Sequence, residues 1–333
     1  MSDTLHIITG GNGFTGRILI DRLLEQNATV VAFDHAPPPA DLPAAVAHVQ
    51  GDINDPAAVA RLPLSADCIV YHLAARQFHL QVPKTGRDEW FAEVNVGGTA
   101  TLLAAMRRTH AQRLVFVSTD MVYGLPQKTP VPPDHPLHPL GPYGRSKAAA
   151  EALIRTEMEQ QGLRATIFRP RLISGPGRLG VLTKLFRLIE LNLPVPLIGP
   201  GTNRYQMISV FDAVSAIMAA VAHDLPAGPF NLGSANPPLV RDLLRQLVRF
   251  AGSRSIVIPT PSGVIKPVLR LLDRLGHPLL YAEQFEIADI DYQLDDTLTR
   301  TQLGWQPQHD DLSMLQDAYR IYQEKRQNSR LAA

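Results

Sequence analysis

The sequence predicts an α/β fold, a doubly wound parallel sheet that carries a smaller C-terminal α/β lobe. Two observations lead to this prediction. As far as Pro170, short apolar runs alternate with stretches whose apolar residues recur at helical spacing, which is typical of parallel strands covered on both faces. Beyond Pro170 the alternation loosens into helices and a few short strands, as expected for a second, less regular lobe.

The first part of the chain is expected to contain six strands and three long helices. The strands are residues 5–9, 29–33, 46–50, 68–73, 113–118 and 164–168, and the helices are residues 14–24, 88–109 and 143–161. A shorter helix begins after Asp55, a favoured N-cap residue, with Pro56 in its first turn. The proline-rich segment 124–142 reads as a loop that shapes a site.

The second part is expected to form a substrate-binding lobe interleaved with the first. Its predicted helices and strands are residues 181–191, 212–223, 240–251 and 312–325 and residues 195–198 and 205–210, respectively. We therefore divide the chain into residues 1–175, which contain the sheet, and residues 176–333, which contain the lobe.

Composition excludes several classes of protein. Basic and acidic residues balance, 32 against 31, so the overall charge predicts neither nucleic acid nor an anionic membrane as a partner. Cys68 is the single cysteine and cannot form an intrachain disulfide; we expect it to be a buried thiol. No apolar run is long enough to span a bilayer, no signal sequence precedes the first strand and no metal site is indicated, so we expect a soluble, cytoplasmic protein.

A glycine-rich turn follows the first strand and opens the first helix. Residues 9–16 read Thr-Gly-Gly-Asn-Gly-Phe-Thr-Gly, in which Gly11, Gly13 and Gly16 match Gly-x-Gly-x-x-Gly and Gly10 offers an alternative spacing. Glycines there allow a tight turn and close approach of the backbone to a pyrophosphate, which the helix N-terminus attracts. The context of strand, loop and helix predicts a dinucleotide site.

Asp34 ends the second predicted strand, 21 residues beyond Gly13. A carboxylate at that position can accept hydrogen bonds from both ribose hydroxyls of adenosine and repels a 2′-phosphate. Because His35 rather than an arginine follows it, the sequence favours NAD over NADP. The alternative is that Asp34 only caps a turn.

Tyr143 and Lys147 lie four residues apart on the predicted helix 143–161, so they share one face. Lowering a phenol pKa from ~10 to near 7 takes about 4 kcal/mol, which neighbouring cations can supply. The spacing alone is common, and helix packing explains most instances of it. Its weight depends on the motifs that precede it.

Taken together and in order, the motifs resemble extended short-chain dehydrogenase/reductases of the NAD-dependent epimerase/dehydratase group, over nearly the whole chain. The residues that carry the resemblance are 9–16, Asp34, 51–53, 72–75, 95–99, 118–120, 122–124, 143–147, 169–170 and 175–177. The resemblance implies a Rossmann domain in residues 1–175, NAD as cofactor, a small-molecule substrate, and a homodimer through helices 88–109 and 143–161.

The resemblance also implies roles for individual residues. Tyr143 would be the general base or acid, Lys147 would lower its pKa and bind the nicotinamide ribose, and Thr119 would hydrogen-bond the reacting oxygen. The implied cofactor-binding residues are Gly10, Gly13, Phe14, Thr15, Gly16, Asp34, Asp52, Ile53, Leu73, Ala74, Ala75, Asn95, Tyr143, Lys147 and Pro170. Taken one at a time, Ile53 and Leu73 could instead be core residues and Asn95 a helix cap.

Two departures concern the substrate. Residues 118–124 resemble the Ser-Thr-Asp-Glu-Val-Tyr-Gly of sugar-nucleotide 4,6-dehydratases, but Met121 replaces the glutamate, so Asp120 lacks its partner and dehydration is disfavoured. Where many nucleotide-sugar enzymes carry a diphosphate-binding arginine, this chain has Tyr205, with Arg204 one residue early and expected on the other face. Arg171 could instead bind an anionic substrate group, although a structural role is equally compatible.

An apolar segment, residues 263–281, interrupts the second part. Its predicted helix carries Val264, Ile265, Val268, Leu269, Leu271, Leu272 and Leu275. We expect these residues to pack in the core of the lobe. The alternative is an apolar lid over a lipid-like substrate, since a similar insertion occurs in the hydroxysteroid-dehydrogenase branch of the superfamily.

Three functions follow in order of preference. The first is NAD-dependent epimerisation at a secondary hydroxyl of a nucleotide-linked sugar, and the second is net dehydrogenation of a larger apolar alcohol, as in hydroxysteroid dehydrogenases. The third is a non-catalytic NAD-sensing protein, which the presence of Thr119, Tyr143 and Lys147 together disfavours.

Overall fold

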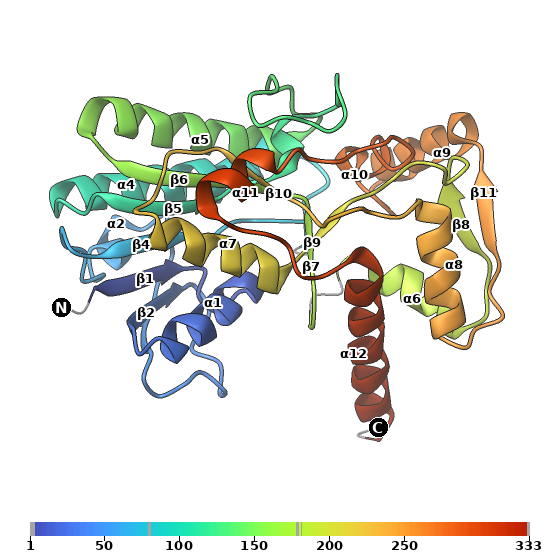
Figure 1. Cartoon of the computed structure of the whole chain (residues 1–333), viewed down its shortest axis with the longest axis horizontal. Helices are drawn as coiled ribbons and strands as arrows, with labels where there is room; N and C mark the ends of the chain where they lie inside the picture. Colours follow the sequence, from blue (N-terminus) through green and yellow to red (C-terminus); the bar gives the residue numbers. More distant parts are fainter. Residues whose placement is uncertain (1–3, 79–80, 178–179, 181, 332–333) are drawn as a thin grey trace.

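The computed structural model describes residues 4–78, 81–177, 180 and 182–331. Its centre is a seven-stranded parallel sheet in the order β10-β6-β5-β4-β1-β2-β3 (Figure 1). The strands are β1 Leu5–Thr9, β2 Thr29–Asp34, β3 Ala47–Gln50, β4 Ile69–His72, β5 Arg113–Val117, β6 Arg164–Pro170 and β10 Phe230–Leu232. The predicted doubly wound fold is confirmed.

Helices cover both faces of the sheet (Figure 1). One face carries α1 (Phe14–Glu25), α7 (Val210–Ala222) and α11 (Thr297–Leu303), and the other carries α2 (Pro56–Val59), α4 (Thr99–Arg108) and α5 (Pro142–Gln161). Neighbouring residues of a strand point to opposite faces, so Ile7 and Ile8 belong to the two different cores. This burial on both sides explains why the strands read as continuous apolar runs.

The predicted helix 88–109 is interrupted. It consists of α3 (Arg87–Ala92), a π-helical segment η1 (Glu93–Gly98) and α4 in direct succession. A Cβ added at Gly98 would lie 2.5 Å from Cγ2 of Ile53, so only glycine permits the contact with the loop after β3. The wider turn places Asn95 on the inner side, where it faces the loop after β4.

A smaller lobe lies at one end of the sheet (Figure 1). Its two parallel strands, β8 (Val195–Ile198) and β11 (Val257–Thr260), share a core with α6 (Leu182–Glu190), α8 (Val240–Phe250) and α12 (Asp311–Leu331). Val181, where the first helix of the lobe was expected to begin, lies outside the described residues.

Two short strands, β7 (Leu172–Ser174) and β9 (Met207–Ser209), pair between the sheet and the lobe. The strand predicted at 205–210 is therefore shorter than expected, because Ser209 caps α7 through its hydroxyl, which accepts a hydrogen bond from the Phe211 N–H. Strand β10 and helices α7 and α11 come from beyond residue 175 but complete the main sheet, so the two parts of the chain are interleaved.

The apolar segment departs from expectation. It forms α9 (Ser262–Arg274) and leads into α10 (Ala282–Phe285). The expectation of core packing was wrong for most of its apolar side chains, because Leu269 alone among the large apolar residues of α9 is buried. The charged face of α9 is held against the protein by ion pairs, and this turns the opposite, apolar face outward.

Within the described part of the chain, no helix is both long enough and apolar enough to cross a membrane.

Candidate active site

The glycine-rich turn joins the end of β1 to α1 and leans on two neighbouring strands. The N–H groups of Gly10 and Gly11 donate to the Phe33 carbonyl at 2.8 and 3.2 Å. Gly10 has φ +72°, and a Cβ there would lie 2.7 Å from the Ala74 nitrogen. Gly16 is equally constrained, since its Cβ would lie 2.5 Å from the Gly10 oxygen. These contacts explain why the motif requires glycines.

The N-terminus of α1 is suited to a bound anion. Gly13 caps the helix without any side-chain hydrogen bond, and the first turn contains no acidic residue that would repel an anion. The Oδ1 atom of Asn12 is buried and has no hydrogen-bond partner among the described residues. Phe14 packs towards Gly175, where an added Cβ would lie 3.2 Å from the Phe14 ring. The loop therefore fits the pyrophosphate of a dinucleotide, with Thr15 in the same first turn.

Asp34 lies at the end of β2, almost fully buried. Its Oδ2 accepts a hydrogen bond from the Asn12 N–H at 3.1 Å, and its Oδ1 accepts one from the Ala36 N–H at 3.0 Å. His35 lies beside it, with Nδ1 3.0 Å from Oδ1. The carboxylate thus holds the glycine-rich turn, and Oδ2, which accepts one hydrogen bond from the protein, keeps a second lone pair for a ligand.

The other predicted cofactor residues surround the same edge of the sheet. Asp52 is exposed and accepts from the Asn54 N–H at 2.8 Å, whereas Ile53 is buried beneath Gly98. The loop of Leu73, Ala74 and Ala75 follows β4 directly beside Gly10, and Pro170 ends β6. Their roles at a cofactor remain predictions.

Asn95 ties this edge to the helix that carries Tyr143. Its amide donates to the Arg76 carbonyl at 3.2 Å and to the Ser146 hydroxyl at 2.9 Å, and its Oδ1 accepts from the Arg76 N–H at 2.8 Å. The sequence pattern did not identify Ser146 or Arg76 as members of this network. Ser146 had one signal, its place between Tyr143 and Lys147.

The structure brings Thr119, Tyr143 and Lys147 into one buried region. Tyr143 and Lys147 lie one turn apart on α5, and Thr119 follows β5; all three are less than 10% exposed, at 6%, 2% and 7%. Gly144 permits the approach, since an added Cβ would lie 2.6 Å from the Met121 carbonyl oxygen. The predicted catalytic residues therefore lie together next to the glycine-rich edge.

Lys147 is a buried cation. Its Nζ lies 4.1 Å above the ring centre of Phe116, a cation–π contact. Burial lowers the pKa of Lys147 to about 7, and the Glu151 carboxylate one turn further on opposes that shift. Glu151 itself binds Arg169. Removing an ammonium from water costs free energy, so packing alone does not explain a buried lysine at this position. A functional role for the amino group does explain it.

An aromatic wall stands beside Tyr143. Its ring centre lies 5.3 Å from that of Phe78 and 5.6 Å from that of Phe91, and Phe78 stacks on Tyr281 at 4.8 Å. A cavity of about 110 Å³ opens between these rings, Leu140 and the start of α5. No pattern in the sequence connected these aromatic residues, because they come from three separate segments.

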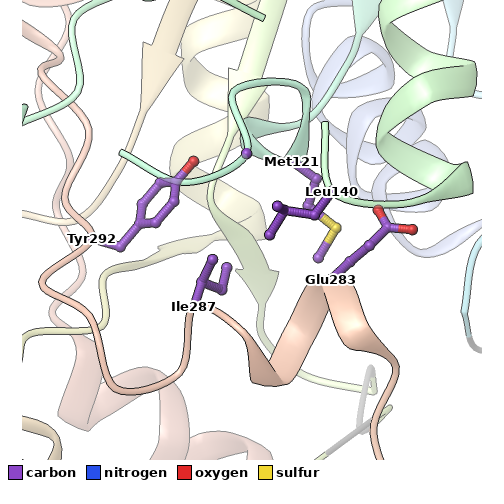
Figure 2. Close-up of a pocket in the computed structure, with 6 residues that line it drawn as sticks. Met121, Leu140, Glu283, Ile287 and Tyr292 are labelled. Atoms are coloured by element: carbon purple, nitrogen blue, oxygen red, sulfur yellow. The ribbon is translucent and has the colours of Figure 1, made fainter. Parts of the chain in front are cut away.

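Glu283, from α10, is a further residue of this site that no sequence pattern indicated. Its carboxylate accepts hydrogen bonds from the N–H groups of Tyr143 and Gly144 at 3.1 and 3.0 Å. Burial raises the pKa of Glu283 to about 7. Gly141 leaves room for it, because a Cβ there would lie 2.3 Å from Oε1. Figure 2 shows this carboxylate at the edge of a small pocket that Met121 also lines.

The predicted substrate residues separate into two groups. Asp120 and Arg171 form a buried ion pair, and the Arg171 guanidinium lies between the rings of Tyr205 and Tyr292, 4.5 and 4.2 Å from their centres. One guanidinium nitrogen of Arg171, Nη2, has no hydrogen-bond partner among the described residues. Arg204 instead donates to the Pro237 carbonyl. Arg204 stands one residue before the position at which a diphosphate-binding arginine is expected. Tyr205, at that position, contacts Arg171, and Arg204 takes no part in this ion pair.

No group of three or more His, Cys, Asp or Glu side chains in the described ranges could hold a metal ion.

Comparisons with known proteins identify the family of the chain. The model of the NAD dependent epimerase/dehydratase family matches residues 6–233. The chain is 29% identical to a UDP-glucose 4-epimerase of Streptomyces lividans, covering 94% of each, and 30% identical to a dTDP-glucose 4,6-dehydratase of Mycolicibacterium smegmatis, covering 92% of this chain and 88% of that one. It is also 31% identical to an uncharacterized protein of Sinorhizobium fredii, covering 96% and 79%.

Solved structures show the same fold. A UDP-glucose 4-epimerase from Thermotoga maritima aligns with a TM-score of 0.78 at 22% identity, over 97% of this chain and 99% of that one. A dTDP-glucose 4,6-dehydratase from Streptomyces venezuelae, solved with NAD bound, aligns with a TM-score of 0.76 at 26% identity, over 97% and 98%. The chain therefore belongs to the NAD-dependent epimerase/dehydratase family, and it is an NAD-dependent enzyme of the extended short-chain dehydrogenase/reductase type.

Proposed function

We propose that the enzyme epimerises a nucleotide-linked sugar by reversible hydride transfer at a secondary hydroxyl. The observation that carries the proposal is the burial of Tyr143 and Lys147 on one face of α5, next to Thr119 and close to the glycine-rich edge. Its relatives include UDP-glucose 4-epimerases and dTDP-glucose 4,6-dehydratases, which supports this substrate class.

NAD, when bound, supplies an acceptor and donor of hydride at its nicotinamide ring. The N-terminal turn of α1 would hold the pyrophosphate, and Asp34 would accept hydrogen bonds from the adenosine ribose. Asp52 and Ile53 would contact the adenine, residues 73–75 and Asn95 would line the path of the cofactor, and Pro170 would lie near the nicotinamide.

Tyr143 would take the proton of the substrate hydroxyl during oxidation and return it during reduction. Lys147 would favour the phenolate by its positive charge, and the low dielectric around it strengthens that effect. Thr119 would hydrogen-bond the reacting oxygen and hold the carbon in line for hydride transfer.

Epimerisation fits better than dehydration because Met121 leaves Asp120 without a carboxylate beside it in the sequence. Asp120 is already bound to Arg171, and Glu283 accepts two backbone hydrogen bonds. A carboxylate held in this way serves as an anchor for the start of α5. We therefore do not assign either acid to the elimination of water.

A second candidate is dehydrogenation of a larger apolar alcohol. The aromatic wall of Phe78, Phe91 and Tyr281 beside Tyr143 favours it, because a sugar ring would require more polar partners there. The pair of Arg171 with Asp120 also leaves only one guanidinium nitrogen for a substrate diphosphate.

Two measurements separate these candidates. An epimerase retains its cofactor, so the purified protein should contain NAD and turn over substrate without net NADH, whereas a dehydrogenase forms one NADH per product. A thermal-shift screen of UDP- and dTDP-sugars against sterols and other alcohols identifies the class, because a ligand at about 100 Kd stabilises by ~2.7 kcal/mol. Absence of a shift with every nucleotide sugar would sink the leading proposal.

The catalytic assignment has its own test. Tyr143→Phe keeps the ring contacts with Phe78 and Phe91 but removes the phenolic proton, so kcat should fall about 10²–10⁴-fold. Tyr322→Phe, in the core of the lobe, is the matched control and should keep its activity. Full turnover by Tyr143→Phe would show that another group moves the proton.

We also propose that residues 1–175 bind the cofactor, that residues 176–333 bind the substrate, and that two copies pair through helices α3–α4 and α5. Light scattering of wild type against a variant with Arg145→Glu, an exposed side chain in the first turn of α5, tests the assembly; a monomeric wild type would exclude it.

A further inference from the structure

We propose that α9 docks the enzyme on the headgroup region of an anionic lipid bilayer. The docking surface is the apolar stripe formed by Val264, Val268 and Leu271 of α9, by Leu275 at its C-cap, and by Leu279, which follows the helix. These side chains are 65%, 45%, 56%, 60% and 51% exposed. The inference does not depend on which substrate the enzyme uses.

The spacing places the stripe on one side of α9. Steps of four, three and four residues keep the four helical positions within a narrow arc of the helix surface. A helix of a globular protein normally turns such an arc towards the core. Here the arc points to solvent, and all but Leu125 of the large exposed apolar side chains in the described chain lie between residues 191 and 279.

Ion pairs fix this orientation. Lys266 binds Asp289 at 2.6 Å and Arg270 binds Glu286 at 2.6 Å, both on the inner side of the helix. Asp273 binds Arg87 at 2.7 Å. The charged face of α9 therefore forms ion pairs with the rest of the protein. Rotating the helix so that the stripe turned inward would break all three pairs. The exposure of the apolar stripe therefore follows from the ion pairs that orient α9.

The surroundings of the stripe favour anionic lipid. Lys184 donates to the Leu279 carbonyl at 2.9 Å, the side chain of Lys84 lies against Gly276, and Arg274 and His277 are exposed. The segment 261–281 contains one acidic residue, Asp273, and Arg87 neutralises it. Cations around an apolar stripe match an interface of acyl chains and anionic headgroups.

A protein partner fits less well. Five half-exposed aliphatic side chains fall short of the ~800 Å² that each partner of a stable complex buries. The stripe also contains no aromatic residue, whereas binding energy between proteins is concentrated on tryptophan, tyrosine and arginine. Aliphatic side chains on a surface helix are typical of insertion at the acyl boundary.

The stripe lies next to the active site along the chain. From Leu279 the backbone continues to Tyr281 and Glu283, which line the cavity beside Tyr143. Docking through α9 would therefore hold this cavity near the headgroups, where an amphiphilic molecule could reach it.

Vesicle flotation of the full-length protein tests the proposal, with phosphatidylcholine vesicles and with vesicles that also contain phosphatidylglycerol. We expect wild type to float with the anionic vesicles and to be released by high salt. The double variant L271S/L275S should bind at least about tenfold more weakly, since its two side chains would lose their insertion. Leu125→Ser, with a leucine 49% exposed elsewhere, is the matched control and should bind as wild type does.

Charge is tested separately with Arg274→Glu, which should weaken binding to anionic vesicles, against Arg108→Glu on α4, which should not. Circular dichroism confirms that each variant is folded. Failure of wild type to float, or unchanged flotation of L271S/L275S, overturns the proposal. It is equally overturned if L271S/L275S abolishes self-association in sedimentation and wild type ignores vesicles, since a second copy would then cover the stripe.

Discussion

Helices α5 and α9 depart from ordinary helix patterning in opposite directions. Helix α5 buries Lys147 and Glu151, at 2% and 0% exposure, whereas α9 exposes Val268 and Leu271 and pairs three of its charged residues with the rest of the protein. A buried charge and an exposed apolar stripe both cost free energy, so each is informative where it occurs. The first accompanies a candidate catalytic site and the second a candidate docking surface.

Lys147→Met gives the largest expected effect and tests whether the buried charge on α5 serves catalysis. Because the cation that favours the Tyr143 phenolate is lost, kcat should fall about 10²–10⁴-fold. Stability should hold or rise, since a methionine avoids the desolvation of a buried ammonium. Steady-state kinetics and denaturant unfolding measure the two quantities. If stability fell while kcat held, Lys147 would be structural.

Arg169→Ala, a change on β6, tests the pairing of Glu151, the second buried charged residue of α5. The guanidinium binds Glu151 at 2.6 and 3.0 Å with both groups buried, so its removal should cost about 3–5 kcal/mol. Arg155→Ala is the matched control, because Arg155 binds the same carboxylate at 2.8 Å from a position that is 37% exposed, and it should cost under ~1 kcal/mol. Similar losses in both variants on urea unfolding would contradict the difference in burial.

Leu269→Ala and Leu271→Ala compare the two sides of α9. Leu269 is 4% exposed, so its truncation should lower the free energy of unfolding by about 2–5 kcal/mol. Leu271 is 56% exposed, and its truncation should change stability by less than ~0.5 kcal/mol. Equal losses would mean that the stripe is packed in solution.

Glu283 links the two regions, and its titration gives a smaller effect. Its folded pKa of about 7 lies above the ordinary 4.5, so between these values the folded state binds more protons than the unfolded state. The contribution of Glu283 to the stability of the protein is therefore lost as pH rises through this range. Glu283→Gln stays neutral, and its melting temperature relative to wild type should therefore rise from acidic to neutral pH. A constant difference across that range would show that Glu283 titrates normally.

Kinetics sharpen the role of the same residue. Glu283→Ala frees the N–H groups of Tyr143 and Gly144, so kcat should fall about tenfold, and Glu283→Gln, which keeps one acceptor oxygen, should recover part of it. NAD binding should change less than kcat in both variants, because Glu283 hydrogen-bonds the start of α5 rather than the glycine-rich turn. An unchanged kcat in Glu283→Ala would leave Glu283 with a packing role only.

Features that depend on local spacing can be predicted from the amino-acid sequence. The sheet follows from its apolar runs, the turn at Gly10–Gly16 from its glycines, and the pairing of Tyr143 with Lys147 from the geometry of one helical turn. In each case the interacting residues are close in the chain or recur in a fixed order along it, so their physical requirements are written into consecutive positions.

Contacts between segments that are distant in the chain become visible in the folded structure alone. Glu283 accepts a hydrogen bond from the Tyr143 N–H although 140 residues separate the two in the chain. Phe78, Phe91 and Tyr281 come from three separate segments and lie together beside Tyr143. Which face of α9 is exposed depends on Glu286 and Asp289, two acidic residues that lie beyond the end of the helix in the chain. An apolar pattern fixes that a helix has two faces, but which face is covered depends on the charges that the rest of the chain places beside it.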